Sequence, residues 1–212
     1  MPPKPIEQQP ILELRSEFNI ICDIVEENSR VLDLGCGEGN LLKLLHEKRH
    51  ADCAGVEVSE DKVYACVSKG LSVHHGDIDE GLADFPDNSF DYVILSETLQ
   101  EVRKPALVFQ EMLRVGRKCI ASFPNFGYWQ ARWQLLMGRS PITDTLPFEW
   151  YEGPNIQFLT INDFIRFCQH KHYVIDHAHY FCKGKSVSLF PNLFADSALF
   201  VLEKEAFHNS SS

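Results

Sequence analysis

The fold is decided by one stretch, which reads Val31-Leu32-Asp33-Leu34-Gly35-Cys36-Gly37-Glu38-Gly39-Asn40. Its apolar start predicts a buried strand, and four leucines within residues 41–45 predict the buried face of a helix. Three glycines at alternate positions lie between them, where they allow tight turns and the close approach of a ligand to bare backbone. Amide N–H groups at the helix start would face that ligand. We therefore expect a strand, a binding loop and a helix.

Alternation of strand and helix patterns continues along the chain. An amphipathic helix from Leu14 to about Val25 precedes the first strand, and a cap, Thr160 answered by Asp163, opens a late helix that runs to about residue 170. The remaining patterns predict helices at 60–69 and 105–115 and strands at 54–58, 71–74, 90–95, 119–123, 173–175 and 198–202. This order predicts an α/β fold with a doubly wound, mostly parallel sheet, in a single domain over residues 1–212.

Regular alternation stops between residues 124 and 155. This insertion is rich in aromatic residues, namely Phe126, Tyr128, Trp129, Trp133, Phe148, Trp150 and Tyr151. Three interpretations remain open: a substrate lid, a surface that docks a partner, and a cover for an exposed sheet edge. Residues 1–12 and 205–212 are expected to be loose tails.

Composition narrows the classes of function. The 212 residues carry a formal net charge of −10, which disfavours general binding to nucleic acid and to anionic membranes. No stretch approaches the ~20 apolar residues of a membrane span, and the start, Met-Pro-Pro-Lys-Pro, lacks the apolar run of a secretory signal, so we expect a cytoplasmic protein. Seven cysteines without a C-x-x-C pair are typical of free thiols in a reducing compartment.

Histidine pairs two residues apart, at 170 and 172 and at 177 and 179, raise the question of a metal site. On a strand, such pairs would share one face. No acidic or cysteine partner follows at a known metal spacing, so we expect surface residues of strands and no metal.

Carboxylates stand where two further strands are predicted to end. Glu57 lies twenty residues beyond Gly37, where an acid can accept both hydroxyls of a ribose diol. Asp77 follows the third strand and could accept the exocyclic amine of an adenine, while Ile78 covers the ring. The spacing Gly-x-Gly-x-Gly differs from the dinucleotide pattern Gly-x-Gly-x-x-Gly and argues against NAD.

These residues together resemble the S-adenosylmethionine site of class I methyltransferases. The resemblance implies a seven-stranded Rossmann-like sheet with an antiparallel last strand, and S-adenosylmethionine or S-adenosylhomocysteine as the ligand. The candidate ligand-binding residues are Asp33, Gly35, Cys36, Gly37, Gly39, Glu57, Val58, Asp77, Ile78 and Ser96.

Longer runs resemble the MetW family of methionine biosynthesis proteins. The runs are Gly76-Asp77-Ile78-Asp79-Glu80-Gly81-Leu82, the stretch 90–102, Ser122-Phe123-Pro124-Asn125-Phe126-Gly127-Tyr128-Trp129, and Leu146-Pro147-Phe148-Glu149-Trp150-Tyr151 with Pro154-Asn155-Ile156. The likeness covers about residues 18–202. It implies a protein that acts with homoserine O-acyltransferase in methionine synthesis, and it identifies no methyl acceptor.

Catalytic residues are not assigned from the sequence. The fourth strand is followed by Ser96-Glu97-Thr98-Leu99, not by the Asn/Asp-Pro-Pro-Tyr/Phe run of many amide and amine methylases. Glu97, Gln100 and Glu101 lie either near a reactive methyl group or on an ordinary polar strand end. Alternative hypotheses are therefore a methyltransferase acting on a small molecule and an inactive scaffold.

Overall fold

The structure is a computed structural model that describes residues 10–204. The predicted tails at 1–9 and 205–212 lie outside the described residues. Helix α1 (Pro10–Ile24) begins at Pro10, so residues 10–12 of the expected N-terminal tail are helical.

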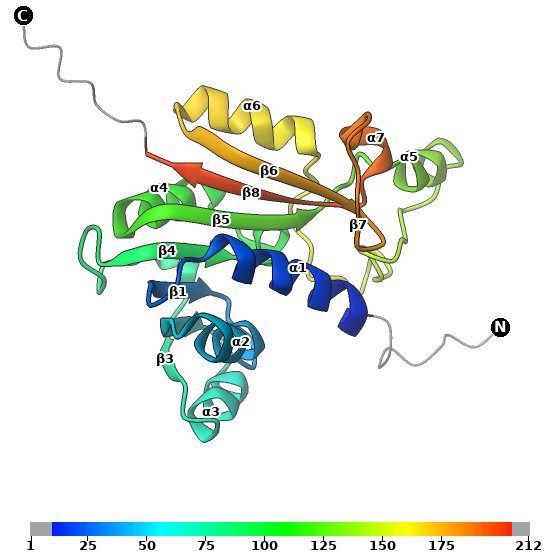
Figure 1. Cartoon of the computed structure of the whole chain (residues 1–212). Coiled ribbons are helices and arrows are strands. Elements are labelled where there is room, and N and C mark those ends of the chain that lie inside the picture. Colours follow the sequence, from blue (N-terminus) through cyan, green and yellow to red (C-terminus); the bar gives the residue numbers. More distant parts are fainter. Residues whose placement is uncertain (1–9, 205–212) are drawn as a thin grey trace, which may run out of the picture.

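A central sheet organises the described part of the chain (Figure 1). Its strand order is β3-β2-β1-β4-β5-β8-β6-β7, with β1 to β5 parallel and β8 antiparallel to both β5 and β6. The strands are β1 (Arg30–Leu34), β2 (Asp52–Glu57), β3 (Ser72–His75), β4 (Phe90–Leu95), β5 (Gly116–Pro124), β6 (Val174–Cys182), β7 (Lys185–Ser186) and β8 (Ser197–Glu203). The predicted α/β fold with an antiparallel last strand is thereby confirmed.

Helices cover both faces of this sheet. Side chains alternate along each strand, so that on β1 Val31 packs toward α1 and α2 whereas Leu32 packs toward the opposite layer. That layer contains Phe109 of α4 and Phe164 of α6. The helices are α2 (Asn40–Arg49), α3 (Glu60–Ser68), α4 (Pro105–Val115), α5 (Trp129–Leu136), α6 (Ile161–Lys171) and α7 (Pro191–Phe194), with 3-10 turns η1 (Ile78–Glu80) and η2 (Leu99–Glu101).

Local sequence signals explain several helix boundaries. The predicted cap of α6 is a full capping box, in which Thr160 Oγ1 accepts from the Asp163 amide and the Asp163 carboxylate accepts from the Thr160 amide. Helix α4 begins with Pro105, whose missing N–H costs nothing in a first helical turn.

The prediction of seven strands differs from the structure by one. Strand β6 was expected only at 173–175, but it continues to Cys182 and turns back through Lys183 and Gly184 into the two-residue strand β7. Both turn residues have positive φ, 51° and 71°, which matches the backbone twist of a tight hairpin. Lysine is not among the residues that favour such a turn, so the hairpin was not predicted.

The histidine prediction was wrong for one of its two pairs. His170 lies in α6 and His172 caps that helix with φ 58°, so neither is on a strand. His177 and His179 do lie on β6. Within residues 10–204, no group of three His, Cys, Asp or Glu side chains could hold a metal ion.

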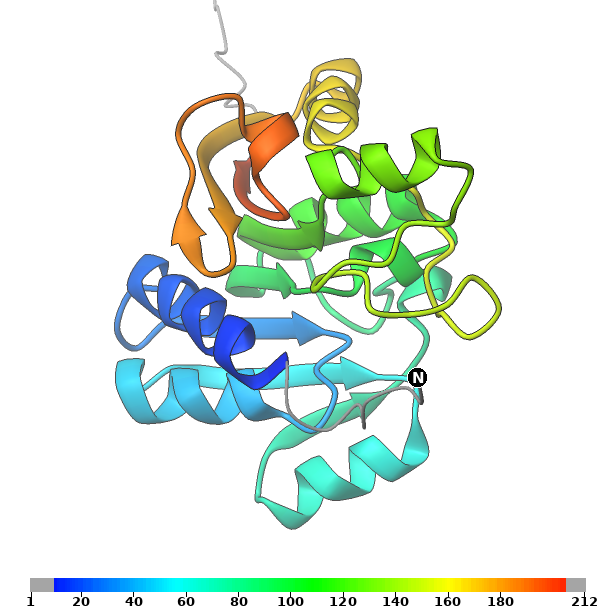
Figure 2. The same cartoon turned by 90° about the vertical axis from the view of Figure 1, so that its right-hand side faces the viewer.

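The segment between β5 and α6 crosses the carboxyl ends of the parallel strands (Figure 2). It contains α5 and a long irregular stretch, residues 137–160. Hydrogen bonds join this stretch to η2 through Ile156 and Gln157, and to the start of β8 through Thr145, whose hydroxyl donates to the Asp196 carbonyl. These bonds place the insertion over the end of the sheet where a ligand of this fold would lie.

Candidate functional site

The glycine turn after β1 has the backbone that its sequence predicts. Gly35, Gly37 and Gly39 all have positive φ, at 72°, 56° and 77°. The amides of Gly35 and Cys36 donate to the Val56 carbonyl, at 2.8 and 3.1 Å, which fixes the turn against the end of β2.

Helix α3 supports the same turn from behind. The Cys66 thiol donates to the Gly37 carbonyl at 3.2 Å, and Lys69 Nζ donates to the Glu38 carbonyl at 2.8 Å. A Cβ on Gly39 would lie against Leu71 and 3.0 Å from Cys66 Sγ, whereas a Cβ on Gly37 would meet no atom within 4 Å. The turn is therefore closely packed on its helix side and open beside Gly37.

Glu57 holds this turn from the end of β2. One carboxylate oxygen accepts the Gly37 amide and the other the Ser59 amide, both at 2.9 Å, and the side chain is buried. A carboxylate has about four lone-pair sites, so each oxygen keeps one for a further donor. Glu57 is thus at once a structural anchor and a free acceptor.

Asp33 is a buried acid beside Glu57. Burial, and then the neighbouring charge of Glu57, raise the pKa of the Asp33 carboxyl to about 8. A cation bound beside Asp33 would reverse that effect, because an opposite charge favours the ionised carboxylate.

A cavity of about 400 Å³ opens beside these residues, a size typical of small-molecule sites. Six of the predicted residues line it: Gly35, Glu57, Val58, Asp77, Ile78 and Ser96. The structure thus brings together the ends of β1, β2, β3 and β4 around one space. Asp33, in β1, and Cys36, Gly37 and Gly39, in the turn behind the cavity, are not among its lining residues.

Both carboxylate oxygens of Asp77 already accept hydrogen bonds within the chain, which the sequence did not indicate. Its Oδ1 accepts the Asp79 amide at 2.9 Å, and its Oδ2 accepts Arg103 Nη2 at 2.6 Å. Asp79 is buried and also accepts the amides of Arg103 and Lys104. Burial alone would raise the pKa of Asp79, but these amides and the guanidinium outweigh it and lower the pKa. An adenine amine at Asp77 would share the carboxylate with Arg103.

Ser96 points toward an acid that the sequence analysis missed. Its hydroxyl donates to Glu17 Oε1 at 2.8 Å, and Ser122 donates to the same oxygen. Burial raises the pKa of Glu17, although the two serine hydroxyls oppose the rise. Glu17 comes from α1, 79 residues before Ser96, so no local spacing pattern could have indicated the contact.

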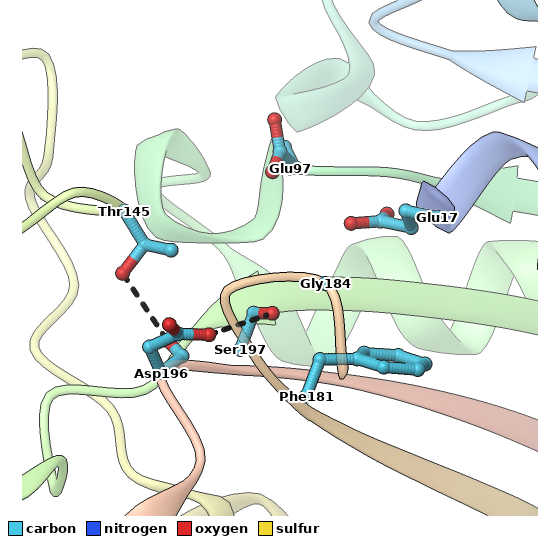
Figure 3. A pocket seen from close by; sticks show the side chains of 7 residues that line it. All are labelled: Glu17, Glu97, Thr145, Phe181, Gly184, Asp196 and Ser197. Atoms are coloured by element: carbon cyan, nitrogen blue, oxygen red, sulfur yellow. Dashed lines mark hydrogen bonds between the residues drawn. The ribbon is translucent and has the colours of Figure 1, made fainter. Parts of the chain in front are cut away.

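A second, small cavity of about 20 Å³ adjoins this acid, large enough for about one water molecule (Figure 3). Glu17 and Glu97 line one side, and Asp196 lines it from the start of β8. Burial also raises the pKa of Asp196. Because Glu97 lines both cavities, the acid cluster is next to the large cavity.

The sequence left two interpretations of the polar residues after β4: a place near the reactive methyl group, or an ordinary polar strand end. The structure separates these residues. Glu97 and Glu101 line the large cavity, and burial raises the pKa of Glu101. Gln100 does not line it; its amide nitrogen donates to the Glu97 carbonyl and its backbone carbonyl binds the insertion. Gln100 is therefore a structural residue.

Cys36 lies inside the turn, buried against Leu42 and Cys66. Burial, followed by the charge of Asp33, raises the pKa of its thiol, which makes a thiolate nucleophile unfavourable.

No helix among residues 10–204 has the length and apolar character to cross a lipid bilayer.

Solved structures share this architecture. PH0226 protein from Pyrococcus horikoshii has a TM-score of 0.69 at 19% identity, covering 94% of this chain and 93% of that chain. An S-adenosylmethionine dependent methyltransferase from Mesorhizobium loti has a TM-score of 0.66 at 19% identity, covering 89% and 98%. The fold is that of class I methyltransferases.

Sequence comparison gives the family. A bifunctional methionine biosynthesis protein, MetXA/MetW of Rhodopirellula baltica, is 37% identical over 208 residues, which are 92% of this chain and 33% of that protein. A ubiquinone biosynthesis O-methyltransferase of Methylococcus capsulatus is 36% identical over 42% of this chain and 39% of its own length. The chain thus spans between a third and two fifths of the length of these relatives. The model of the family "Methionine biosynthesis protein MetW" matches residues 15–202, so the chain belongs to the MetW family.

Proposed function

We propose that this protein binds S-adenosylmethionine or S-adenosylhomocysteine and acts in methionine synthesis with homoserine O-acyltransferase. The observation that carries the proposal is the 400 Å³ cavity at the ends of β1 to β4, with Glu57 and Asp77 on its wall and the glycine turn beside it. The fused Rhodopirellula baltica relative, in which MetXA and MetW share one polypeptide, supports the partner.

The residues present fit an adenosyl ligand with an amino-acid tail. Glu57 retains acceptor capacity for a ribose diol, since each oxygen has given only one site to the backbone. Asp33, whose pKa burial raises to about 8, would be ionised by an ammonium group near the turn. Ile78 and Val58 supply apolar wall for a purine, with Asp77 at its edge. S-adenosylmethionine would supply a sulfonium methyl group, which S-adenosylhomocysteine lacks; the chain supplies orientation and charge.

A calorimetric titration with S-adenosylhomocysteine tests the binding. Because Glu57 would make two charge-assisted hydrogen bonds, we expect Glu57→Gln to weaken affinity about 100-fold. Glu60→Gln, at an exposed position three residues later, is the matched control and should bind as the wild type does. Absence of wild-type binding at millimolar ligand, or equal affinity in both variants, would contradict the proposal.

The partnership is tested separately by mixing the chain with purified homoserine O-acyltransferase. We expect a complex in size-exclusion chromatography and a higher rate of acyl transfer. If neither is observed, the accessory role is wrong even when the ligand binds.

A second candidate function, methyl transfer to a small molecule, is favoured by Glu17. This buried acid has a raised pKa and lies beside the wall of the large cavity through Ser96, where it could act as a general base. Formation of S-adenosylhomocysteine from S-adenosylmethionine in the presence of an acceptor, lost in Glu17→Gln, would support this function. A broad acceptor screen without turnover would leave the accessory role.

A further inference from the structure

Helix α5 exposes the apolar residues that a surface helix normally buries. Within it, Ala131 is the buried side chain, and Gln130 and Gln134 are half-buried. Trp129 and Trp133 are exposed, the latter by 59%, and Leu136 follows on the same side at helical spacing. Covering the outer side of such a helix would remove its large apolar side chains from water, which is favourable.

The chain after α5 extends this apolar region. Gln134 forms two hydrogen bonds with the backbone of Ile142, at 2.7 and 2.9 Å, which hold the stretch against the helix. In both views this stretch starts at the end of α5 and runs away from it over the carboxyl ends of the strands (Figures 1 and 2). We define the apolar face by its exposed side chains: Trp129, Trp133, Leu136, Met137, Ile142, Trp150 and Tyr151.

The composition of this face is that of a protein interface. It holds three tryptophans and a tyrosine, and tryptophan and tyrosine are enriched among the residues that dominate binding energy. Single exposed apolar residues are ordinary, but an accumulation on one helix and its following stretch marks a site of interaction. Asp144 forms an ion pair at 3.1 Å with Lys183, in the turn between β6 and the edge strand β7, so this stretch also covers part of the sheet edge. The side chains of the apolar face are exposed to solvent and take no part in that cover.

We propose that the apolar face is the surface on which homoserine O-acyltransferase docks. This inference rests on the proposed function and adds the location of the contact. The occupant is argued from the Rhodopirellula baltica relative, in which this chain matches a third of a polypeptide that also carries MetXA. Fusion keeps the two domains of that relative at a high effective concentration, whereas two separate chains must hold together through a surface of their own.

The stretch that carries part of the apolar face continues to the wall of the large cavity. The amides of Ile156 and Gln157 donate to the Gln100 carbonyl at 2.8 and 2.9 Å, and the Gln157 side chain donates to the Val102 carbonyl at 3.0 Å. Val102 lines the cavity. A partner on the apolar face therefore contacts the same stretch that forms hydrogen bonds with the cavity wall.

The experiment compares three variants of the full chain for binding to purified acyltransferase. We expect Trp133→Ser and Trp150→Ser each to raise Kd about 30-fold, as loss of a central aromatic does at interfaces. Tyr64→Ser is the matched control, since Tyr64 is 72% exposed on α3, at the far end of the sheet (Figure 1). Its Kd should stay within about twofold of the wild type. Unfolding midpoints should be equal in all four proteins, because each side chain is exposed.

The outcomes separate this inference from the proposed function. A wild-type complex whose affinity is unchanged by both tryptophan variants overturns the location and leaves the partnership intact. No wild-type complex overturns both. Self-association of the chain alone, abolished in Trp133→Ser, would make a second copy the occupant and would also overturn the proposal.

Discussion

Two regions at the carboxyl ends of the strands use buried and exposed residues in opposite ways. Around β1 and β2, charged groups are buried, and the glycine turn is packed so closely on one side that a methyl group at Gly39 has no room. Around α5, small and polar residues lie inward while tryptophans lie in solvent. In the first region the unfavourable free energy comes from acidic side chains buried in the folded chain, as expected for a ligand site. In the second it comes from apolar side chains exposed to water, as expected for a docking site.

The largest expected effect concerns the buried carboxyl group of Asp33 in the first region. The folded pKa of Asp33 is about 8 and its ordinary value is 3.8, so between these values the folded state holds a proton that the unfolded state has lost. Stability from this group is complete below pH 3.8 and falls as pH rises toward 8, by at most about 1.4 kcal/mol per pH unit. Between pH 5 and 7 the loss is about 3 kcal/mol.

Urea unfolding at several pH values checks this expectation. Asp33→Asn should remove that part of the pH dependence and make the ligand-free protein more stable at pH 7. Asp61→Asn, at an exposed position on α3, should leave the slope unchanged. Equal slopes in the wild type and Asp33→Asn would show that Asp33 is ionised, and would break the distinction between the two regions.

A second prediction separates two ways in which alanine would destabilise the glycine turn: a clash of the added Cβ with its neighbours, and the strain of an alanine at positive φ. Gly39→Ala must place a Cβ at positive φ against Leu71 and Cys66, and should lower the free energy of unfolding by about 3 kcal/mol. Gly37→Ala has the same backbone strain but open space, so about 1 kcal/mol is expected. Chemical denaturation of both variants measures the difference, and equal losses would mean that helix α3 does not constrain the turn.

A smaller expected effect tests how the second region is held. Asn125 is buried, accepts the Gly127 amide at 2.9 Å and donates to the Ala195 carbonyl at 2.8 Å. Asn125→Ala leaves these groups unpaired and should cost about 2 kcal/mol. Hydrogen exchange should rise in residues 126–160 before it rises in β1 and β2. The exposed neighbour Asn162→Ala should cost less than about 0.5 kcal/mol.

Local sequence patterns predicted most of the fold and part of the candidate site. The glycine turn, Glu57 and the strand ends were predictable because their geometry depends on residues within one strand, loop and helix unit. The alternation of apolar residues also located β4 at 90–95, as observed. The predicted family and the predicted mostly parallel sheet are confirmed, whereas the ligand is a proposal.

Long-range pairing explains what the sequence missed. Glu17 reaches Ser122 across 105 residues, and no periodicity links α1 to β5 over that distance. The engagement of Asp77 by Arg103 likewise depends on how η1 packs near the start of α4. Helix α5 was not predicted, because its tryptophans and leucines lie on the exposed side and give no pattern of inward-facing apolar residues.

The position of β8 has a consequence for how the protein is made. This strand is the last one within residues 10–204, yet it lies between β5 and β6. While the ribosome is still adding residues 197–203, β5 has no neighbour on one side, and its backbone N–H and C=O groups form an open edge. The nascent chain therefore passes through a stage that is prone to aggregation and ends only when β8 inserts. Early capture by a chaperone would protect that open edge.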